Sequence, residues 1–244
     1  HTNDRRQRQM CIRDRMSITD NDIWYMRSAL NLARTGLGRT WPNPSVGCVI
    51  VKDGIILGRS RTHDSGRPHA ETQALEQAGE KAKGASVYVT LEPCAHHGHT
   101  PSCAEELIKA GVKEVFFAVQ DPDLRVNGQG RQLLESGGLK VHSGLLEEEA
   151  YTLNQGFFLN RMQNRPMITL KMATTWDGKM ATESGESQWI TGLEARRYVH
   201  LERAQHDAIL VGVNTILEDD PSLTVRLPGV NHKIVRVICD THLR

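Results

Sequence analysis

The chain has 244 residues and a formal net charge of +1, with 39% hydrophobic and 24% charged residues. These are ordinary values for a globular protein, so they exclude wholesale disorder, and no apolar run approaches the ~20 residues of a membrane-spanning helix. The five cysteines are odd in number and widely spread. This argues against a disulfide framework and favours a reducing compartment, so we expect a cytoplasmic protein.

The first 15 residues differ from the rest of the chain. They hold five arginines against two aspartates and show no apolar periodicity, and Met16 follows them directly. We therefore expect residues 1–15 to be a non-native or disordered leader. The remaining residues carry a net charge of −2, which gives no electrostatic reason to expect a nucleic-acid partner.

From Met16 onward, helix and strand patterns alternate. Thr19 and Asp22 resemble a capping box that opens a helix, and Gly36 ends it. The turn WPNPSVG leads into a strand over 46–51, which KDG turns back as a hairpin. Periodicity then predicts the alternating elements of an α/β domain: helix 68–79, strand 85–90, helix 103–111, strand 113–119, helix 130–137, strand 140–144 and helix 146–162.

The alternation restarts after Asn164-Arg165-Pro166, so we place a domain boundary near residue 164. The predicted domains are 16–163 and 164–244. In the second, strands are predicted at 167–173, 207–212 and 234–239, and a helix at 193–204. Three strands and one helix are too few to cover both faces of a doubly wound sheet, so we expect the N-terminal part of a domain that is incomplete here.

One histidine and two cysteines stand where they suit a metal ion. His69 and Cys103 lie at predicted helix starts, and Cys94 follows a predicted strand. Zinc prefers imidazole and thiolate ligands, and three of them leave its fourth position open for water. Glu71 lies two residues beyond His69, so we expect it to reach that water and to carry a proton from it to a leaving amine.

This order of residues resembles the signature of the zinc deaminases, in which His-x-Glu is followed by Pro-Cys and a second cysteine. Here eight residues separate Cys94 from Cys103 instead of two, which argues against the nucleic-acid deaminases. We favour an open catalytic site because Glu71 is placed for catalysis. The alternative is a closed structural zinc site, which would need a fourth ligand such as His96, His97 or His99.

Longer segments extend this pattern on both sides of the predicted boundary. Before it stand WPNPSVGCVIVKDG, PHAETQAL and AKGASVYVTLEPCAHHGHTPSCAEELIKAGVKEVFFAVQDPD, and after it LKMATTWDGKMATESGESQWIT and ILEDDPSLTVR. Together they resemble the bifunctional deaminase–reductases of riboflavin biosynthesis, over about residues 17–244. The resemblance implies a cytidine-deaminase-like three-layer α/β/α domain followed by the start of a dihydrofolate-reductase-like α/β domain.

Carried over position by position, the resemblance makes His69, Cys94 and Cys103 the zinc ligands, Glu71 the proton donor, and Asn43 the residue that holds the pyrimidine. In the second half it implies NADPH contacts at Ala173, Trp189, Thr215 and Asp219. It implies substrate contacts at Ser187, Arg203, Leu223 and Arg226. The forked guanidinium groups of Arg203 and Arg226 suit hydrogen bonding to the phosphate of a phosphorylated sugar. No predicted strand is followed by G-x-G-x-x-G, the dinucleotide-binding motif of the Rossmann fold. The expectation that NADPH is the cofactor therefore rests on the resemblance alone.

We therefore expect a zinc-dependent hydrolase that deaminates 2,5-diamino-6-(5-phosphoribosylamino)pyrimidin-4-one. The resemblance adds an NADPH-dependent reduction of the ribosyl to the ribityl side chain. The expected partner is this phosphorylated pyrimidine, with no nucleic acid and no membrane, and assembly into a homo-oligomer stays open. Two alternatives remain: a nucleoside or tRNA deaminase, and a zinc-stabilised binding module, which would need zinc to fold but would release no ammonia.

Overall fold

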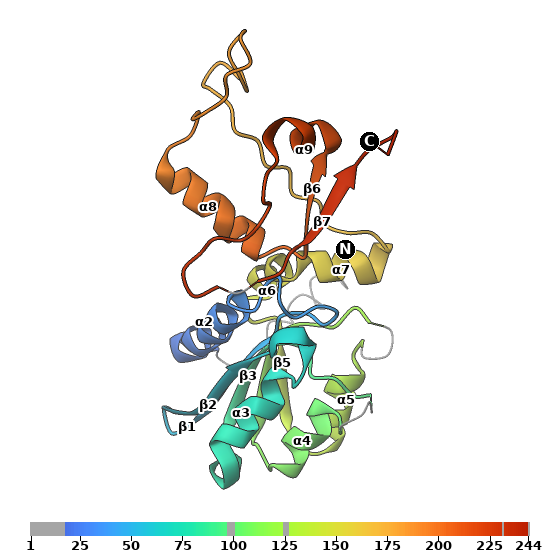
Figure 1. Ribbon diagram of the computed structural model, residues 1–244. Helices are drawn as coiled ribbons and strands as arrows, with labels where there is room; N and C mark the ends of the chain where they lie inside the picture. Colours follow the sequence, from blue (N-terminus) through green and yellow to red (C-terminus); the bar gives the residue numbers. More distant parts are fainter. Residues whose placement is uncertain (1–17, 97–100, 124–126, 231, 244) are drawn as a thin grey trace, which may run out of the picture.

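The computed structural model describes residues 18–96, 101–123, 127–230 and 232–243 (Figure 1). The expected leader, residues 1–15, lies outside the described residues, and so do His97 and His99. Within the described part, no helix is both long enough and apolar enough to cross a membrane.

A five-stranded sheet forms the centre of the first part of the chain. Its strands are β1 (Gly47–Lys52), β2 (Ile55–Arg61), β3 (Ser86–Leu91), β4 (Glu114–Val119) and β5 (Lys140–Ser143), in the order β2-β1-β3-β4-β5. Strand β1 is antiparallel to its neighbours β2 and β3, whereas β3, β4 and β5 run parallel to one another. The strands β1, β3 and β4 are buried along almost their whole length, as a sheet covered on both faces requires.

Helices cover both faces of this sheet, which gives the expected three layers. On one face α2 (Asp20–Arg34) packs on β1 and β3, and α6 (Glu147–Leu153) packs on β4. The other face carries α3 (Ala70–Ala78), α4 (Cys103–Lys109) and α5 (Gln129–Ser136), which lie together in front of the sheet in Figure 1. Gly47 lets α2 approach closely, since an added Cβ would lie 1.9 Å from the carbonyl oxygen of Ala29.

The predicted capping box at the start of α2 is present. The hydroxyl of Thr19 accepts a hydrogen bond from the backbone N–H of Asp22, and the Asp22 carboxylate accepts one from the backbone N–H of Thr19. The two bonds satisfy amide groups that the first turn of a helix leaves unpaired. The hydrophobic core lies between α2 and the sheet and between the sheet and α3–α5, with Phe117, Met26 and Leu30 among its largest buried side chains.

One predicted helix is two helices in the structure. In place of a single helix over 146–162, the chain forms α6 and then α7 (Gln155–Gln163), with a break at Asn154. The buried side chain of Asn154 hydrogen-bonds to the backbone of Ser45, 109 positions away. Helical periodicity carries no information about so distant a partner, which is why the sequence prediction missed the break.

The second part of the chain forms α8 (Leu193–Ala204), β6 (Ala208–Gly212), α9 (Val213–Asp219) and β7 (Val235–Cys239), with the two strands parallel. The structure adds α9, which the sequence did not predict. The strand predicted at 167–173 is wrong: residues 165–175 form neither helix nor strand, and Ile168 and Leu170 are 84% and 80% exposed. Among the described residues no neighbouring strand pairs with this segment, and apolar pattern cannot replace backbone pairing.

Candidate metal centre and active site

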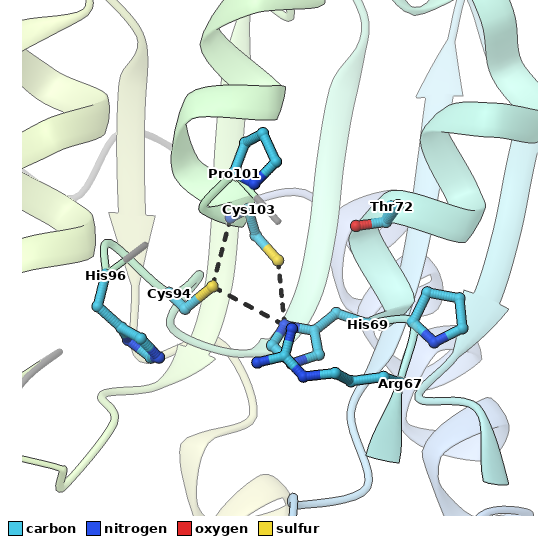
Figure 2. Close-up of a pocket in the computed structure, with 8 residues that line it drawn as sticks. Arg67, His69, Thr72, Cys94, His96, Pro101 and Cys103 are labelled. Carbon is cyan, nitrogen blue, oxygen red and sulfur yellow. Dashed lines mark hydrogen bonds between the residues drawn. The ribbon is translucent and has the colours of Figure 1, made fainter. Parts of the chain in front are cut away.

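Three segments meet at the predicted metal site. His69 immediately precedes α3, Cys94 follows β3, and Cys103 begins α4. His69 Nδ1 lies 3.3 Å from Cys103 Sγ and 3.8 Å from Cys94 Sγ, and all three candidate ligand atoms lie within 4.8 Å of one another (Figure 2). Zn–S bonds of ~2.3 Å in a tetrahedral site separate the ligand atoms by roughly 3.5–3.8 Å, so this donor set fits zinc.

Cys94 is the more acidic of the two thiols. The backbone N–H of Cys103 donates to Cys94 Sγ over 3.3 Å. Hydrogen bonds from Cys103, joined by one from His69, lower the pKa of Cys94 to about 4. The site therefore presents a thiolate at neutral pH, which is the form of cysteine that binds metal.

Glu71 lies in the first turn of α3, where only 4% of the residue is exposed. It lines the same cavity as His69 and Cys94 but is not part of the ligand cluster. Burial raises the pKa of Glu71 to about 7, against the opposing effect of the His69 charge. A carboxyl group poised near neutral pH can both accept and release a proton, which general acid–base work requires.

The described residues supply three ligands to this cluster. His96 lies beside the cavity but does not join the ligand atoms, and its ring lies apart from the His69–Cys94–Cys103 triangle in Figure 2. His97 and His99, the other two candidates for a fourth ligand, lie outside the described residues. Within the described part, the arrangement is that of an open site.

A cavity of about 300 Å³ opens beside the cluster. It is lined by the turn that carries Asn43, by the ends of β3 and β4, and by α7. This volume suits one small molecule. Charged side chains contribute much of the lining: Arg67, Glu71, Glu92, Asp121, Asp123 and Arg161.

Asn43 lines this cavity together with His69 and Glu71. Its Nδ2 donates to the carbonyl oxygen of Gly66 over 2.8 Å, which ties its turn to the loop before His69. Gly66 has φ +87°, and an added Cβ would lie 2.8 Å from the carbonyl oxygen of Thr40. Only glycine therefore fits this close approach of the two loops.

Sequence reasoning gave no role to several residues of the cavity wall, among them Glu92, Asp121 and Arg161. Glu92 and Asp121 follow the adjacent parallel strands β3 and β4, and the carboxyl ends of such strands are where ligands bind in α/β sheets. That rule could have identified both. Burial raises the pKa of Asp121 to about 6. Arg161 reaches the cavity from α7, and its place depends on the break at Asn154, so no local signal could have found it.

In the second part of the chain, the structure brings together two of the expected substrate contacts. Arg203 Nη1 donates to the carbonyl oxygen of Thr224 over 2.6 Å, and Arg226 Nη1 donates to the hydroxyl of the same residue over 3.4 Å. Burial and the neighbouring Arg226 lower the pKa of Arg203. Leu223, which precedes Thr224 in the chain, is buried, whereas Ser187 is exposed in a segment without helix or strand.

The four expected NADPH contacts are more scattered. Thr215 and Asp219 lie on α9, while Ala173 and Trp189 lie in segments without helix or strand. The Trp189 ring contacts the guanidinium of Arg196, 4.0 Å from the ring centre. In the described part of the chain, no side-chain hydrogen bond or ion pair joins any two of the four.

Two family models match the chain. The model of the cytidine and deoxycytidylate deaminase zinc-binding region matches residues 19–119, and the model of the RibD C-terminal domain matches residues 166–244. The first match contains the ligand cluster and Glu71. The second contains β6 and β7. The two models confirm the expected fold classes and their order along the chain.

Curated relatives and solved structures agree with both matches. Riboflavin biosynthesis protein RibD of Aquifex aeolicus is 50% identical over 226 residues, which cover 93% of this chain and 64% of the relative. RibD of Escherichia coli is 53% identical over 223 residues, covering 91% and 61%. The structure of Acinetobacter baumannii RibD has a TM-score of 0.82 at 45% identity, covering 91% of this chain and 65% of that one.

A Thermotoga maritima structure is described as a diaminohydroxyphosphoribosylaminopyrimidine deaminase/5-amino-6-(5-phosphoribosylamino)uracil reductase. It has a TM-score of 0.85 at 43% identity, and the match covers 90% of this chain and 63% of that one. The chain thus spans about three fifths of the length of the curated relatives it matches. These matches, in both halves and in the same order, show that the chain belongs to the RibD family of riboflavin biosynthesis proteins.

Proposed function

We propose that residues 16–163 form a zinc-dependent deaminase domain that hydrolyses 2,5-diamino-6-(5-phosphoribosylamino)pyrimidin-4-one and releases ammonia. The observation that carries this proposal is the convergence of His69, Cys94 and Cys103 with the buried Glu71 beside them. The Thermotoga maritima relative, whose description names this deaminase activity, supports the choice of substrate.

The residues of the site divide the work of the reaction. His69, Cys94 and Cys103 would hold the zinc ion, which when bound would lower the pKa of a water molecule enough to supply a nucleophile near neutral pH. Asn43 holds the pyrimidine against the cavity wall. Glu71 takes a proton from the water and delivers it to the departing amine, and its burial keeps that proton from exchanging with bulk water.

The same proposal assigns residues 164–244 to an NADPH-dependent reductase domain that converts the ribosyl to the ribityl side chain. Arg203 and Arg226 would hold the phosphate of the substrate, with Ser187 and Leu223 beside it. The shared contact of the two arginines with Thr224 supports this assignment. The proposed NADPH contacts are Ala173, Trp189, Thr215 and Asp219.

The location we propose is the cytoplasm. Cys48, Cys94, Cys103 and Cys239 are free thiols, which fits a reducing compartment.

Zinc content and ammonia release, measured on the same preparation, test the deaminase proposal. We expect about one zinc ion per chain and ammonia release from the phosphorylated diaminopyrimidine. Ammonia release from a nucleoside or from tRNA instead would support the alternative deaminases. Zinc-dependent folding without ammonia release from any of these substrates would support a binding module.

A further inference from the structure

Asn154 makes two buried hydrogen bonds to a single distant residue. Its Oδ1 accepts from the backbone N–H of Ser45 over 3.0 Å, and its Nδ2 donates to the Ser45 carbonyl oxygen over 2.9 Å. Asn154 is 6% exposed and Ser45 is 2% exposed. The paired bonds fix the distance and the orientation between the two segments, because either backbone group would be left unpaired in the interior without them.

Ser45 belongs to the same turn as Asn43. On the other side of that turn, the Thr40 hydroxyl donates to the Asn43 carbonyl oxygen over 2.9 Å, and Asn43 Nδ2 donates to Gly66. The turn is therefore held at both ends. At the end nearest β1, Asn154 pairs with both backbone groups of Ser45, while the Ser45 hydroxyl donates to the carbonyl oxygen of Ala33 and the Thr62 hydroxyl donates to that of Pro44. A shift at Ser45 would move the Asn43 side chain, two residues away, within the cavity.

Asn154 also sets the start of α7. It ends α6 with φ −107° and ψ 24°, and α7 begins at the next residue. From α7, Phe157 and Arg161 line the same cavity as Asn43. Arg161 Nε lies 4.0 Å from a carboxylate oxygen of Asp123, which also lines the cavity. One buried side chain thus joins two walls of the cavity, the Asn43 turn and α7.

Neither family match includes the part of the cavity wall formed by α7. The deaminase match ends at residue 119 and the RibD C-terminal match begins at residue 166, so Asn154 and α7 lie between them. Asn154 is also outside the ligand cluster and is not among the residues that line the cavity. Its influence on the reaction would have to pass through the residues it holds.

We propose that Asn154 is a positioning residue of the deaminase, which holds the Asn43 turn and α7 in the relative place that binds the substrate. This inference rests on the proposed function. Because Asn154 belongs to neither the ligand cluster nor the cavity lining, its loss should weaken substrate binding and leave zinc binding and the chemical step largely intact.

Steady-state deamination by the full zinc-loaded chain tests this. Asn154→Ala should raise KM for the phosphorylated diaminopyrimidine about tenfold, keep kcat within about twofold, and leave zinc content unchanged. The matched control is Val115→Ala. Val115 is fully buried near the start of β4, whereas Asp121 follows the opposite end of that strand. The substitution should lower Tm without changing KM, since lost stability alone does not alter the binding of substrate by folded molecules.

A double variant tests the route through Asn43. If Asn154 acts through that residue, the KM effect of Asn154→Ala should shrink at least about threefold in an Asn43→Ala background. Should Asn154→Ala not fold, Asn154→Asp keeps the shape and the acceptor but places an oxygen against the Ser45 carbonyl, and should also raise KM. Three outcomes would overturn the inference. They are an unchanged KM in Asn154→Ala or Asn154→Asp, an equal KM effect of Asn154→Ala in the wild-type and Asn43→Ala backgrounds, and a loss of both zinc content and kcat in Asn154→Ala. A wild-type chain without ammonia release would overturn the proposed function first, and this inference with it.

Discussion

The buried carboxylate of Glu92 caps the first turn of α5, where its Oε1 accepts a hydrogen bond from the backbone N–H of Arg131 over 3.0 Å. Its Oε2 accepts two more, from the backbone N–H groups of Gly128 and Asp121. Glu92 is 2% exposed and stands two residues before Cys94. One carboxylate therefore joins the end of β3, the end of β4 and the start of α5 beside the ligand cluster.

Glu92→Gln should lower the free energy of unfolding by about 2–4 kcal/mol, because hydrogen bonds to a charged acceptor are lost and the new amide N–H₂ faces backbone donors. Urea denaturation of the zinc-loaded protein measures this. The control is Glu135→Gln, since Glu135 pairs with the exposed side chain of Arg131 over 2.8 Å, and such pairs contribute about 0–1 kcal/mol. Equal losses in the two variants would contradict the capping role.

Glu71→Gln should retain zinc and lose most deaminase turnover. The substitution keeps the size of the side chain but removes the carboxylate that carries the proton, and general acid–base groups are typically worth ~10²–10⁴-fold in rate. Metal analysis and ammonia release on one preparation give both readouts. Glu76→Gln, on the exposed face of the same helix, should keep full activity. Near wild-type turnover in Glu71→Gln would show that another group moves the proton.

Cys103→Ser should reduce zinc affinity and thermal stability together. Cys103 is a buried member of the ligand cluster, and a hydroxyl is a much poorer zinc ligand than a thiolate. Competition with a chelator measures the affinity, and a melting curve with and without zinc measures the stability. Cys239→Ser, at an exposed thiol on β7, should change neither. A Cys103→Ser protein that keeps both zinc affinity and activity would remove Cys103 from the ligand set.

Features encoded within a few residues could be predicted from the sequence. The capping box at Thr19 and the hairpin between β1 and β2 each depend on a short run of residues. The ligand cluster was predictable for a related reason: its members stand at the ends of elements, and such ends converge at one edge of an α/β sheet.

Features that depend on distant partners could not be predicted. The apolar pattern of 167–173 is that of a strand, but a strand also needs a neighbour, and the described residues offer it none. The helix break at Asn154 depends on Ser45, and the role of Glu92 depends on backbone amides of Gly128 and Arg131. In each case the residue type is visible in the sequence, whereas its partner is set by the tertiary fold.

Asp121 should make stability depend on pH. Burial raises the pKa of its carboxyl group from 3.8 to about 6, and the nearby charges of Asp123 and Glu92 add to the effect. The unfolded chain keeps the ordinary pKa, so the folded state binds more protons between these two values. Ionisation of Asp121 therefore costs stability as the pH rises through this window, by roughly 2–3 kcal/mol at neutral pH.

Asp121→Asn removes this cost and keeps the Oδ1 that accepts the backbone N–H of Asp123 over 2.9 Å. We expect the variant to be more stable than the wild type at about pH 7.5, with a gain that is about 1 kcal/mol smaller at about pH 5, where more of the wild-type carboxyl group is protonated. Urea unfolding at the two pH values measures the difference. The exposed Asp207→Asn serves as the control for loss of one negative charge. A gain of equal size at both pH values would show that Asp121 does not titrate in this range, and that the buried carboxyl group is ionised at both.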